Sequence, residues 1–246
     1  MKHSSSFLAA LILALGSAPL LAGPHAPPLG GPLDGKKDPP KQEKKKDPAK
    51  PADKKPVEAS AKTIAIGAEI DPATSLTDSA GKDHTFKQYR GRIVVLECWS
   101  TTSAKSPQAM RLSKIAQDYA GKNVTVLALD PVPGESTDAK GVQDILKKSG
   151  TAFPVLLDEA GILAERLGAS ALDQVFVLDG KGIVRYTGAI DDDPKGEKAD
   201  KAEVFLTAAL NALVEGKEVA SPTTAPNGGT LRLPKKKPAA SSGGKR

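Results

Sequence analysis

Residues 93–130 read IVVLECWSTTSAKSPQAMRLSKIAQDYAGKNVTVLALD, and this stretch decides the fold class. It begins with a β-branched apolar run at 93–96 and ends with a second apolar run at 124–129. The residues between these runs, 108–120, have the length and the apolar spacing of a helix. Two apolar strands that bracket one helix predict a right-handed βαβ unit, in which the two strands run parallel.

The loop that joins the first strand to the helix carries a motif. Residues 99–102 read Trp-Ser-Thr-Thr, and Ser103-Ala104-Lys105-Ser106 follows directly. This stretch resembles the thioredoxin-like superfamily, in particular the redoxin (AhpC/TSA) and TlpA-like envelope thiol-disulfide oxidoreductases. In those proteins Phe-Trp-Ala-Thr-Trp precedes a Cys-x-x-Cys pair at the start of a helix. By this resemblance Ser103 and Ser106 occupy both cysteine positions, so the scaffold is retained and its usual sulfur chemistry is not.

The other expected elements are similar to those of the same family. Apolar alternation, glycine-containing turns and helix caps predict, in chain order, a β-hairpin at 73–86, a helix capped by Thr137 or Asp138 that ends before Gly150, a strand at 153–158, a helix at 160–167, a β-hairpin at 174–187 and a helix at 199–214. We therefore expect an α/β, thioredoxin-like fold over residues 63–216, with a central mixed sheet flanked by helices.

The two ends of the chain differ in composition from its middle. Residues 1–22 combine a short basic start with an apolar run, which is typical of a secretory signal peptide cleaved after Ala22 or Ala18. An uncleaved N-terminal anchor is the alternative. Residues 23–62 are rich in Pro and Lys, residues 217–246 are again of low complexity, and we expect both to be disordered. The protein is expected to be exported to the bacterial periplasm or cell envelope, with no transmembrane helix after cleavage.

The formal net charge of +6 is unevenly distributed along the chain. Residues 23–62 hold ten Lys against six acidic residues, and residues 217–246 hold seven Lys or Arg against one, so residues 63–216 are net acidic. A nucleic-acid-binding domain places its positive charge on a folded face with interleaved aromatic residues. We therefore expect no nucleic acid partner. The basic ends are expected to act as spacers or to contact anionic surface polymers.

Serine at both motif positions removes the chemistry that the resemblance implies. In the family the first cysteine has a lowered pKa at a helix N-terminus, and the second resolves the mixed disulfide. A serine hydroxyl does not ionise near neutral pH and forms no disulfide, so we interpret Ser103 as the N-cap of the helix. The resemblance also implies a Thr-Pro pair with a cis proline before the penultimate strand, and Leu172-Asp173 stands there instead. The Pro-x-x-x-Thr-x-x-Cys motif of a peroxiredoxin is absent from residues 93–130 as well.

Cys98, the single cysteine, leaves two hypotheses open. Its place in an apolar strand favours core packing, because a reactive thiol needs an exposed, electropositive setting. The alternative is a thiol-disulfide oxidoreductase or peroxidase that uses Cys98 alone. Trp99 is either a core aromatic or a groove residue. The candidate binding residues are those expected to line the groove beside the two serines: Trp99, Thr102, Ser103, Ser106 and Asp173.

Two further features were considered as possible metal or catalytic sites. His84 is the one histidine of the expected domain, and we interpret it as a partly exposed hairpin residue because no nucleophile or metal ligand is near it in sequence. Asp191, Asp192 and Asp193 lack the spaced loop of ligands that calcium needs, so they are interpreted as loop acids before the last helix. We expect neither a metal nor a cofactor.

Together, these patterns predict an exported redoxin-domain protein that has lost its redox activity. We expect it to act as a binding or scaffolding module for a protein or peptide partner in the cell envelope. Two alternatives remain. One is the enzyme that uses Cys98, and the other is a structural role in which the ends of the chain act and the domain only spaces them.

Overall fold

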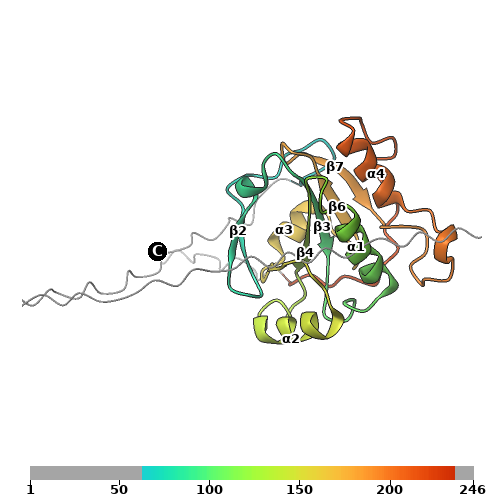
Figure 1. Cartoon of the computed structure of the whole chain (residues 1–246). Helices are drawn as coiled ribbons and strands as arrows, with labels where there is room; N and C mark the ends of the chain where they lie inside the picture. The colour runs from blue at the N-terminus through green and yellow to red at the C-terminus, as the bar shows by residue number, and fades with distance from the viewer. Residues whose placement is uncertain (1–62, 236–246) are drawn as a thin grey trace, which may run out of the picture. The chain divides into compact units, whose positions relative to one another are not determined.

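The structure, a computed structural model, describes residues 63–235, and a mixed sheet of seven strands forms its centre (Figure 1). The strand order is β2-β1-β5-β4-β3-β6-β7. The expected signal peptide at 1–22, the expected linker at 23–62 and residues 236–246 lie outside the described residues. The expected α/β fold with a mixed central sheet is confirmed.

The strand that opens the quoted stretch, β3 (Ile93–Cys98), lies inside the sheet. It pairs in parallel with β4 (Val124–Asp130) and antiparallel with β6 (Val175–Leu178), and five of its six residues are buried. A strand covered on both faces needs a nearly continuous apolar sequence, which explains the run at 93–96. The other strands are β1 (Ser75–Asp78), β2 (Asp83–Thr85), β5 (Val155–Leu157) and β7 (Val184–Gly188).

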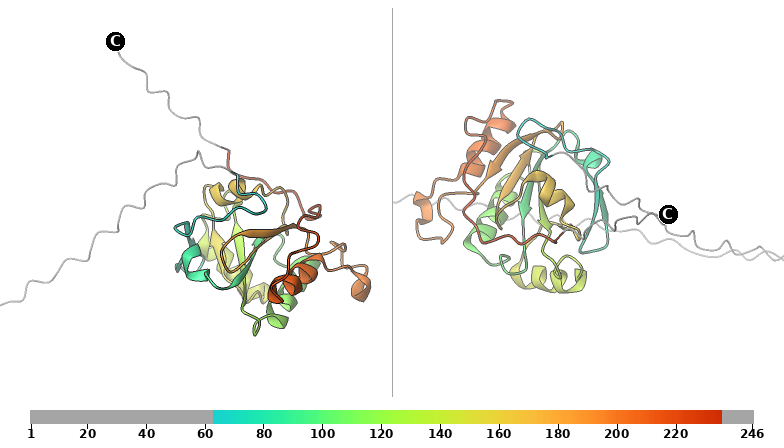
Figure 2. Two further views of the ribbon diagram at one scale, coloured as in Figure 1. Left: turned by 90° about the horizontal axis from the view of Figure 1, so that it is seen from above. Right: turned by 180° about the vertical axis from the view of Figure 1, so that it is seen from behind.

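Helices cover both faces of the sheet. Alternate residues of β3 point to opposite faces, so Val95 joins a first hydrophobic cluster while Val94 joins a second. The short helix α3 packs on the second cluster, and Figure 2 shows it in front of the sheet when the domain is seen from behind. Within residues 63–235 no helix has both the length and the hydropathy to cross a membrane. The helices are α1 (Pro107–Asp118), α2 (Ala139–Ser149), α3 (Ile162–Leu167) and α4 (Phe205–Val214), of which α1, α2 and α4 pack on the first cluster.

The helix ends follow the local signals in one case and depart from them in another. At α2 the Asp138 carboxylate accepts the N–H of Gly141 at 2.9 Å, and Gly150 ends the helix with φ 74°, as the sequence predicts. The helix expected at 199–214 is instead divided into a 3-10 turn at Ala199–Lys201 and α4. Ala202, between the two, has φ −66° and ψ 132°, an extended conformation through which a helix cannot continue.

The 217–235 segment corrects the sequence prediction for this part of the chain. The sequence predicts disorder after residue 216, but the structure places these residues in extended form along the domain. The backbone N–H of Thr187 donates to the carbonyl oxygen of Pro222 at 3.0 Å. Further along, Leu231 and Leu233 pack against the second hydrophobic cluster. Backbone pairing of this kind needs no particular side chains, so a low-complexity sequence does not exclude it.

Candidate functional site

Helix α1 begins one turn later than the interpretation of Ser103 as its N-cap requires. The N-cap is Ser106: its Oγ accepts the N–H of Ala109 at 2.9 Å, and Pro107 is the first helical residue. A residue before proline is held in an extended conformation, which is also what an N-cap requires, and Ser106 has φ −65° and ψ 157°. The N-cap interpretation of Ser103 is therefore wrong. Ser103 lies in the turn that precedes the helix.

Ser103 belongs to a tight turn of hydroxyl side chains. Its Oγ accepts the N–H of Ser100 at 3.1 Å and donates to the carbonyl oxygen of Ser100 at 3.2 Å. Thr102 is exposed, and its hydroxyl lies 2.6 Å from the hydroxyl of Ser100. Neither of these two partners is a histidine or a lysine, the side chains that most often activate a serine nucleophile.

Asp173 lies beside the two serines, where the sequence places it. Its carboxylate accepts the Ser106 hydroxyl at 3.5 Å. Burial raises the pKa of Asp173 to about 6, although hydrogen bonds from Ser106 and Ser103 oppose that shift. No cis peptide bond occurs within residues 63–235, and Asp173 instead adopts φ 59°, a left-handed conformation that aspartate tolerates better than most residues. Its N–H donates to the carbonyl oxygen of Cys98 at 2.7 Å, which ties this loop to β3.

Cys98 and Trp99 lie in the core, and both are 0% exposed. Burial, together with the nearby carboxyl groups of Glu97, Asp158 and Asp173, raises the pKa of the Cys98 thiol. The thiolate is the reactive form, so this environment disfavours reaction at the sulfur. The hypothesis that Trp99 lines a groove is not supported by this structure, because the ring belongs to the hydrophobic cluster that α1 and α4 complete.

Glu97 is a residue near the site that the sequence analysis misses. It is 0% exposed, and neither of its carboxylate oxygens has a hydrogen-bond partner within residues 63–235. Burial, and then the charge of Asp173, raises the pKa of Glu97 well above its ordinary value, so the folded environment favours the protonated form of its carboxyl group. One acidic residue inside the apolar run at 93–99 is the signal that identifies it, because glutamate is rarely buried without a partner.

The groove expected beside the serines is covered in this structure. Ser103 is 6% exposed and Asp173 is 8% exposed, so neither presents an open surface to a ligand. The 217–235 segment crosses the chain next to Asp173. The low-complexity composition of this segment predicts a disordered tail and gives no sign of this contact.

The crossing is a direct contact between two backbones. The N–H of Leu172 donates to the carbonyl oxygen of Gly229 at 2.8 Å, and Ala171 pairs antiparallel with Thr230. A Cβ atom on Gly228 would lie 1.7 Å from the carbonyl oxygen of Leu172. The edge next to the serines therefore already holds an extended polypeptide, and glycine is what lets that polypeptide approach so closely.

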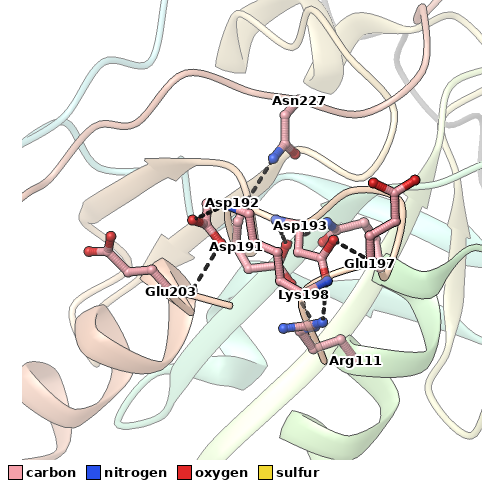
Figure 3. A network of polar contacts seen from close by, with 9 residues as sticks. Arg111, Asp191, Asp192, Asp193, Glu197, Lys198, Glu203 and Asn227 are labelled. Carbon is pink, nitrogen blue, oxygen red and sulfur yellow. Dashed lines mark hydrogen bonds and ion pairs between the residues drawn. The ribbon is translucent and has the colours of Figure 1, made fainter. Parts of the chain in front are cut away.

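A polar network fixes the loop after β7 to helix α1 (Figure 3). Arg111 of α1 forms ion pairs with Asp191 at 2.6 Å and with Asp193 at 3.5 Å. Asn227 of the 217–235 segment donates its side-chain N–H to the carbonyl oxygen of Asp191 at 2.7 Å. Within residues 63–235 no group of three or more side chains is arranged to hold a metal ion. The acids of this loop are instead engaged with cations and backbone amides.

His84 is buried, which corrects its interpretation as a partly exposed hairpin residue. It is 3% exposed. Its Nε2 lies 2.7 Å from a carboxylate oxygen of Asp78, and its Nδ1 lies 2.5 Å from the hydroxyl of Tyr89. The hairpin itself brings these partners together, so the histidine contributes to the edge of the sheet formed by β1 and β2.

Known proteins share the sequence pattern and the fold of this domain. Residues 67–187 match the AhpC/TSA family. The chain is 30% identical over 143 residues to the thiol-disulfide oxidoreductase ResA of Bacillus thuringiensis, which covers 57% of this chain and 76% of that relative. It is 26% identical over 132 residues to the thioredoxin-like protein YneN of Bacillus subtilis, which covers 52% and 76%. The crystal structure of a hypothetical protein from Sinorhizobium meliloti has the same fold, with a TM-score of 0.59 at 24% identity over 70% of this chain and 96% of that one.

Proposed function

Because the chain belongs to the AhpC/TSA redoxin family yet carries oxygen at both positions of the family's cysteine pair, we propose that it is a non-catalytic redoxin that acts by binding a polypeptide. The placement of its one cysteine supports this proposal. Cys98 is fully buried in β3, whereas the turn before α1 carries Ser103 and Ser106.

Disulfide exchange requires a thiolate that can reach the sulfur of a substrate. Cys98 meets neither condition, because burial raises the pKa of its thiol and leaves it no exposed surface. Its backbone is also fixed on both sides: it pairs with Leu129 of β4, and its N–H donates to the carbonyl oxygen of Gln174 at 2.8 Å. A one-thiol enzyme would have to open the centre of the sheet to expose this sulfur.

The same region supports a binding role. The loop at Ala171 and Leu172, just before β6, already pairs its backbone groups with an extended chain through an isolated bridge, and main-chain pairing of this kind is a common way for proteins to hold an extended polypeptide. We place this role in the bacterial cell envelope, because residues 1–22 have the pattern of a secretory signal peptide. The basic residues of 23–62 suit contact with anionic surface polymers there.

The proposal predicts that Cys98 is unreactive in the folded protein. With an excess of an aromatic disulfide reagent at pH 8, we expect labelling in buffer to be at least about 100-fold slower than labelling in urea, because the thiol is buried and un-ionised. We also expect no acceleration of insulin reduction by dithiothreitol. Rapid labelling of the native protein, together with turnover that Cys98→Ser abolishes, would establish the enzyme instead.

Restoring sulfur at the two motif positions is expected to restore a disulfide. The N–H of Ser106 donates to the carbonyl oxygen of Ser103 at 2.8 Å, a turn that brings the two Cα atoms within about 7 Å of each other. The double variant Ser103→Cys/Ser106→Cys should lose two hydrogens on oxidation, as measured by mass spectrometry, and regain them on reduction. Ser103→Cys alone is the matched control, since Cys98 is in the core. A double variant that stays reduced under oxidising conditions would show that the turn itself has lost the required geometry.

A further inference from the structure

The 217–235 segment is held at one end by contacts around a threonine. The hydroxyl oxygen of Thr224 accepts the N–H of Ala189 at 3.0 Å and lies 2.6 Å from the hydroxyl of Tyr186. Gly188, with φ 149°, makes room for this approach, because a Cβ there would lie 2.2 Å from the Thr224 hydroxyl oxygen. The domain therefore offers a shaped seat for an extended chain, and the seat begins at the end of β7.

At the centre of the seat, one position of the segment accepts only glycine. A Cβ at position 228 would lie 1.7 Å from the carbonyl oxygen of Leu172, a backbone atom that cannot move aside cheaply. A Cβ at the next position, 229, would lie 3.4 Å from a Leu172 methyl carbon, which is ordinary contact. Of the two adjacent glycines, the geometry therefore requires glycine only at position 228, and a side chain is allowed at position 229.

Beyond the crossing, the segment buries alternate side chains. Leu231 and Leu233 are half-buried against the second hydrophobic cluster, and Arg232 between them is exposed. This period of two is that of a strand with one face covered. Pro234 follows and lies against Gly161, just before α3, where a Cβ on the glycine would be 2.6 Å from the proline ring.

From these contacts we propose that this seat is a docking site for an extended polypeptide with the pattern Gly-x-x-Leu-x-Leu. In this chain residues 228–233 occupy the seat, and a partner that carries the same pattern takes their place. The inference rests on the proposed binding function and adds the kind of partner that the site selects. It places the partner's backbone on Leu172, next to Asp173 and the two serines.

The occupant is placed so that it can be exchanged. Its outer face is open, with Gly229, Thr230 and Arg232 exposed. Residues 215–227 join the occupant to the end of α4, so its effective concentration at the seat is on the order of millimolar. A free polypeptide competes with this tethered segment for the seat. It binds only those protein molecules from which residues 228–233 have moved away, so its apparent affinity is reduced by that fraction. A variant that releases the segment should therefore raise the apparent affinity for a free peptide.

The test compares two substitutions in the full chain, each of which adds one methyl group. Gly228→Ala is expected to release the segment, and Gly229→Ala is the matched control that should retain it. The probe is a fluorescent peptide of residues 227–235, and its binding is measured by anisotropy. Amide hydrogen exchange at Leu172 reports release independently. We expect the Gly228→Ala chain to bind the peptide at least tenfold more tightly than either the wild type or Gly229→Ala. A peptide that itself carries Gly228→Ala should not bind.

Several results would overturn the proposal. One is fast exchange at Leu172 in the Gly228→Ala chain without any gain in peptide binding, since this would reduce the contact to intramolecular packing. Another is continued protection of the Leu172 amide from hydrogen exchange in both the Gly228→Ala chain and the double variant Leu231→Asp/Leu233→Asp, which offers a second way to release the segment. Binding at the seat would then not depend on the glycine or on the two leucines. Neither outcome affects the labelling of Cys98 or the insulin-reduction assay. These assays therefore test the non-catalytic role independently of the docking site.

Discussion

Replacing Arg111 with alanine is expected to destabilise the domain by about 3 to 5 kcal/mol. Asp191 is 0% exposed and its carboxylate pairs with the Arg111 guanidinium at 2.6 Å, so the substitution leaves a buried charge without its cation. The other carboxylate oxygen accepts the side-chain N–H of Gln108 at 2.7 Å, which keeps the group in place but does not neutralise it. Removing one partner of a buried pair costs far more than the pair contributes.

Lys114 is the matched control because it lies on the same helix, one turn further on. It pairs with Asp118 at 2.9 Å, but its side chain is 74% exposed, so Lys114→Ala should change the free energy of unfolding by less than about 0.5 kcal/mol. Urea unfolding followed by circular dichroism measures both variants. The double variant Arg111→Met/Asp191→Asn should recover part of the lost stability, since it removes the charge as well. If Arg111→Ala costs no more than Lys114→Ala, the network in Figure 3 does not stabilise the fold in the way described here.

Replacing Glu97 with methionine is expected to stabilise the domain, and increasingly so as the pH rises. The carboxyl group is fully buried and has no partner within residues 63–235, so even its protonated form costs about 1 to 3 kcal/mol. The pKa of Glu97 is raised in the folded state, so the folded chain holds a proton that the unfolded chain releases above about pH 4.3. The free energy of unfolding therefore falls as the pH rises, by about 1.4 kcal/mol for each pH unit over which only the folded state is protonated.

Three other buried carboxyl groups, those of Asp130, Asp158 and Asp173, have a raised pKa and add to this pH dependence with the same sign. Burial raises the pKa of Asp173 to about 6 and that of Asp130 to about 7, so both contribute stability at low pH that is lost as the pH rises through those values. Urea unfolding at several values between pH 5 and pH 8 should show a steep decline in the wild type and a shallower one in Glu97→Met. Glu218→Met, at an exposed position, is the control and should leave the profile unchanged. Parallel profiles for the wild type and Glu97→Met would mean that Glu97 ionises freely in the folded protein.

Much of the fold can be predicted from the sequence because its determinants are local. The apolar run at 93–96 is unbroken because β3 is covered on both faces, and the Asp138 cap and Gly150 bound α2 through contacts within a few residues. The start of α1 is also local, but Ser103 and Ser106 are both plausible caps by residue type. Pro107 decides between them, since it holds Ser106 in the extended conformation that a cap needs.

The site is less predictable because its contacts join residues that are distant in sequence. Asp173 is placed beside the serines through the family resemblance, and the structure confirms that contact across 67 positions. His84 and Glu97 are misjudged or missed, since burial of a polar side chain depends on which elements pack over it. Trp99 illustrates the same limit: residue type allows either a groove or the core, and only the packing of α1 and α4 selects the core.

The sequence by itself predicted an α/β fold, because the spacing of apolar residues records which side chains are buried. The resemblance to the redoxin family then marked Ser103 and Ser106 as the positions expected for the family's cysteine pair. Only the tertiary structure decided that residues 217–235 return to the domain and pair with the backbone at Ala171 and Leu172. That contact is made largely by backbone groups, which every residue carries alike, and by glycines whose role is visible only when both chain segments are present.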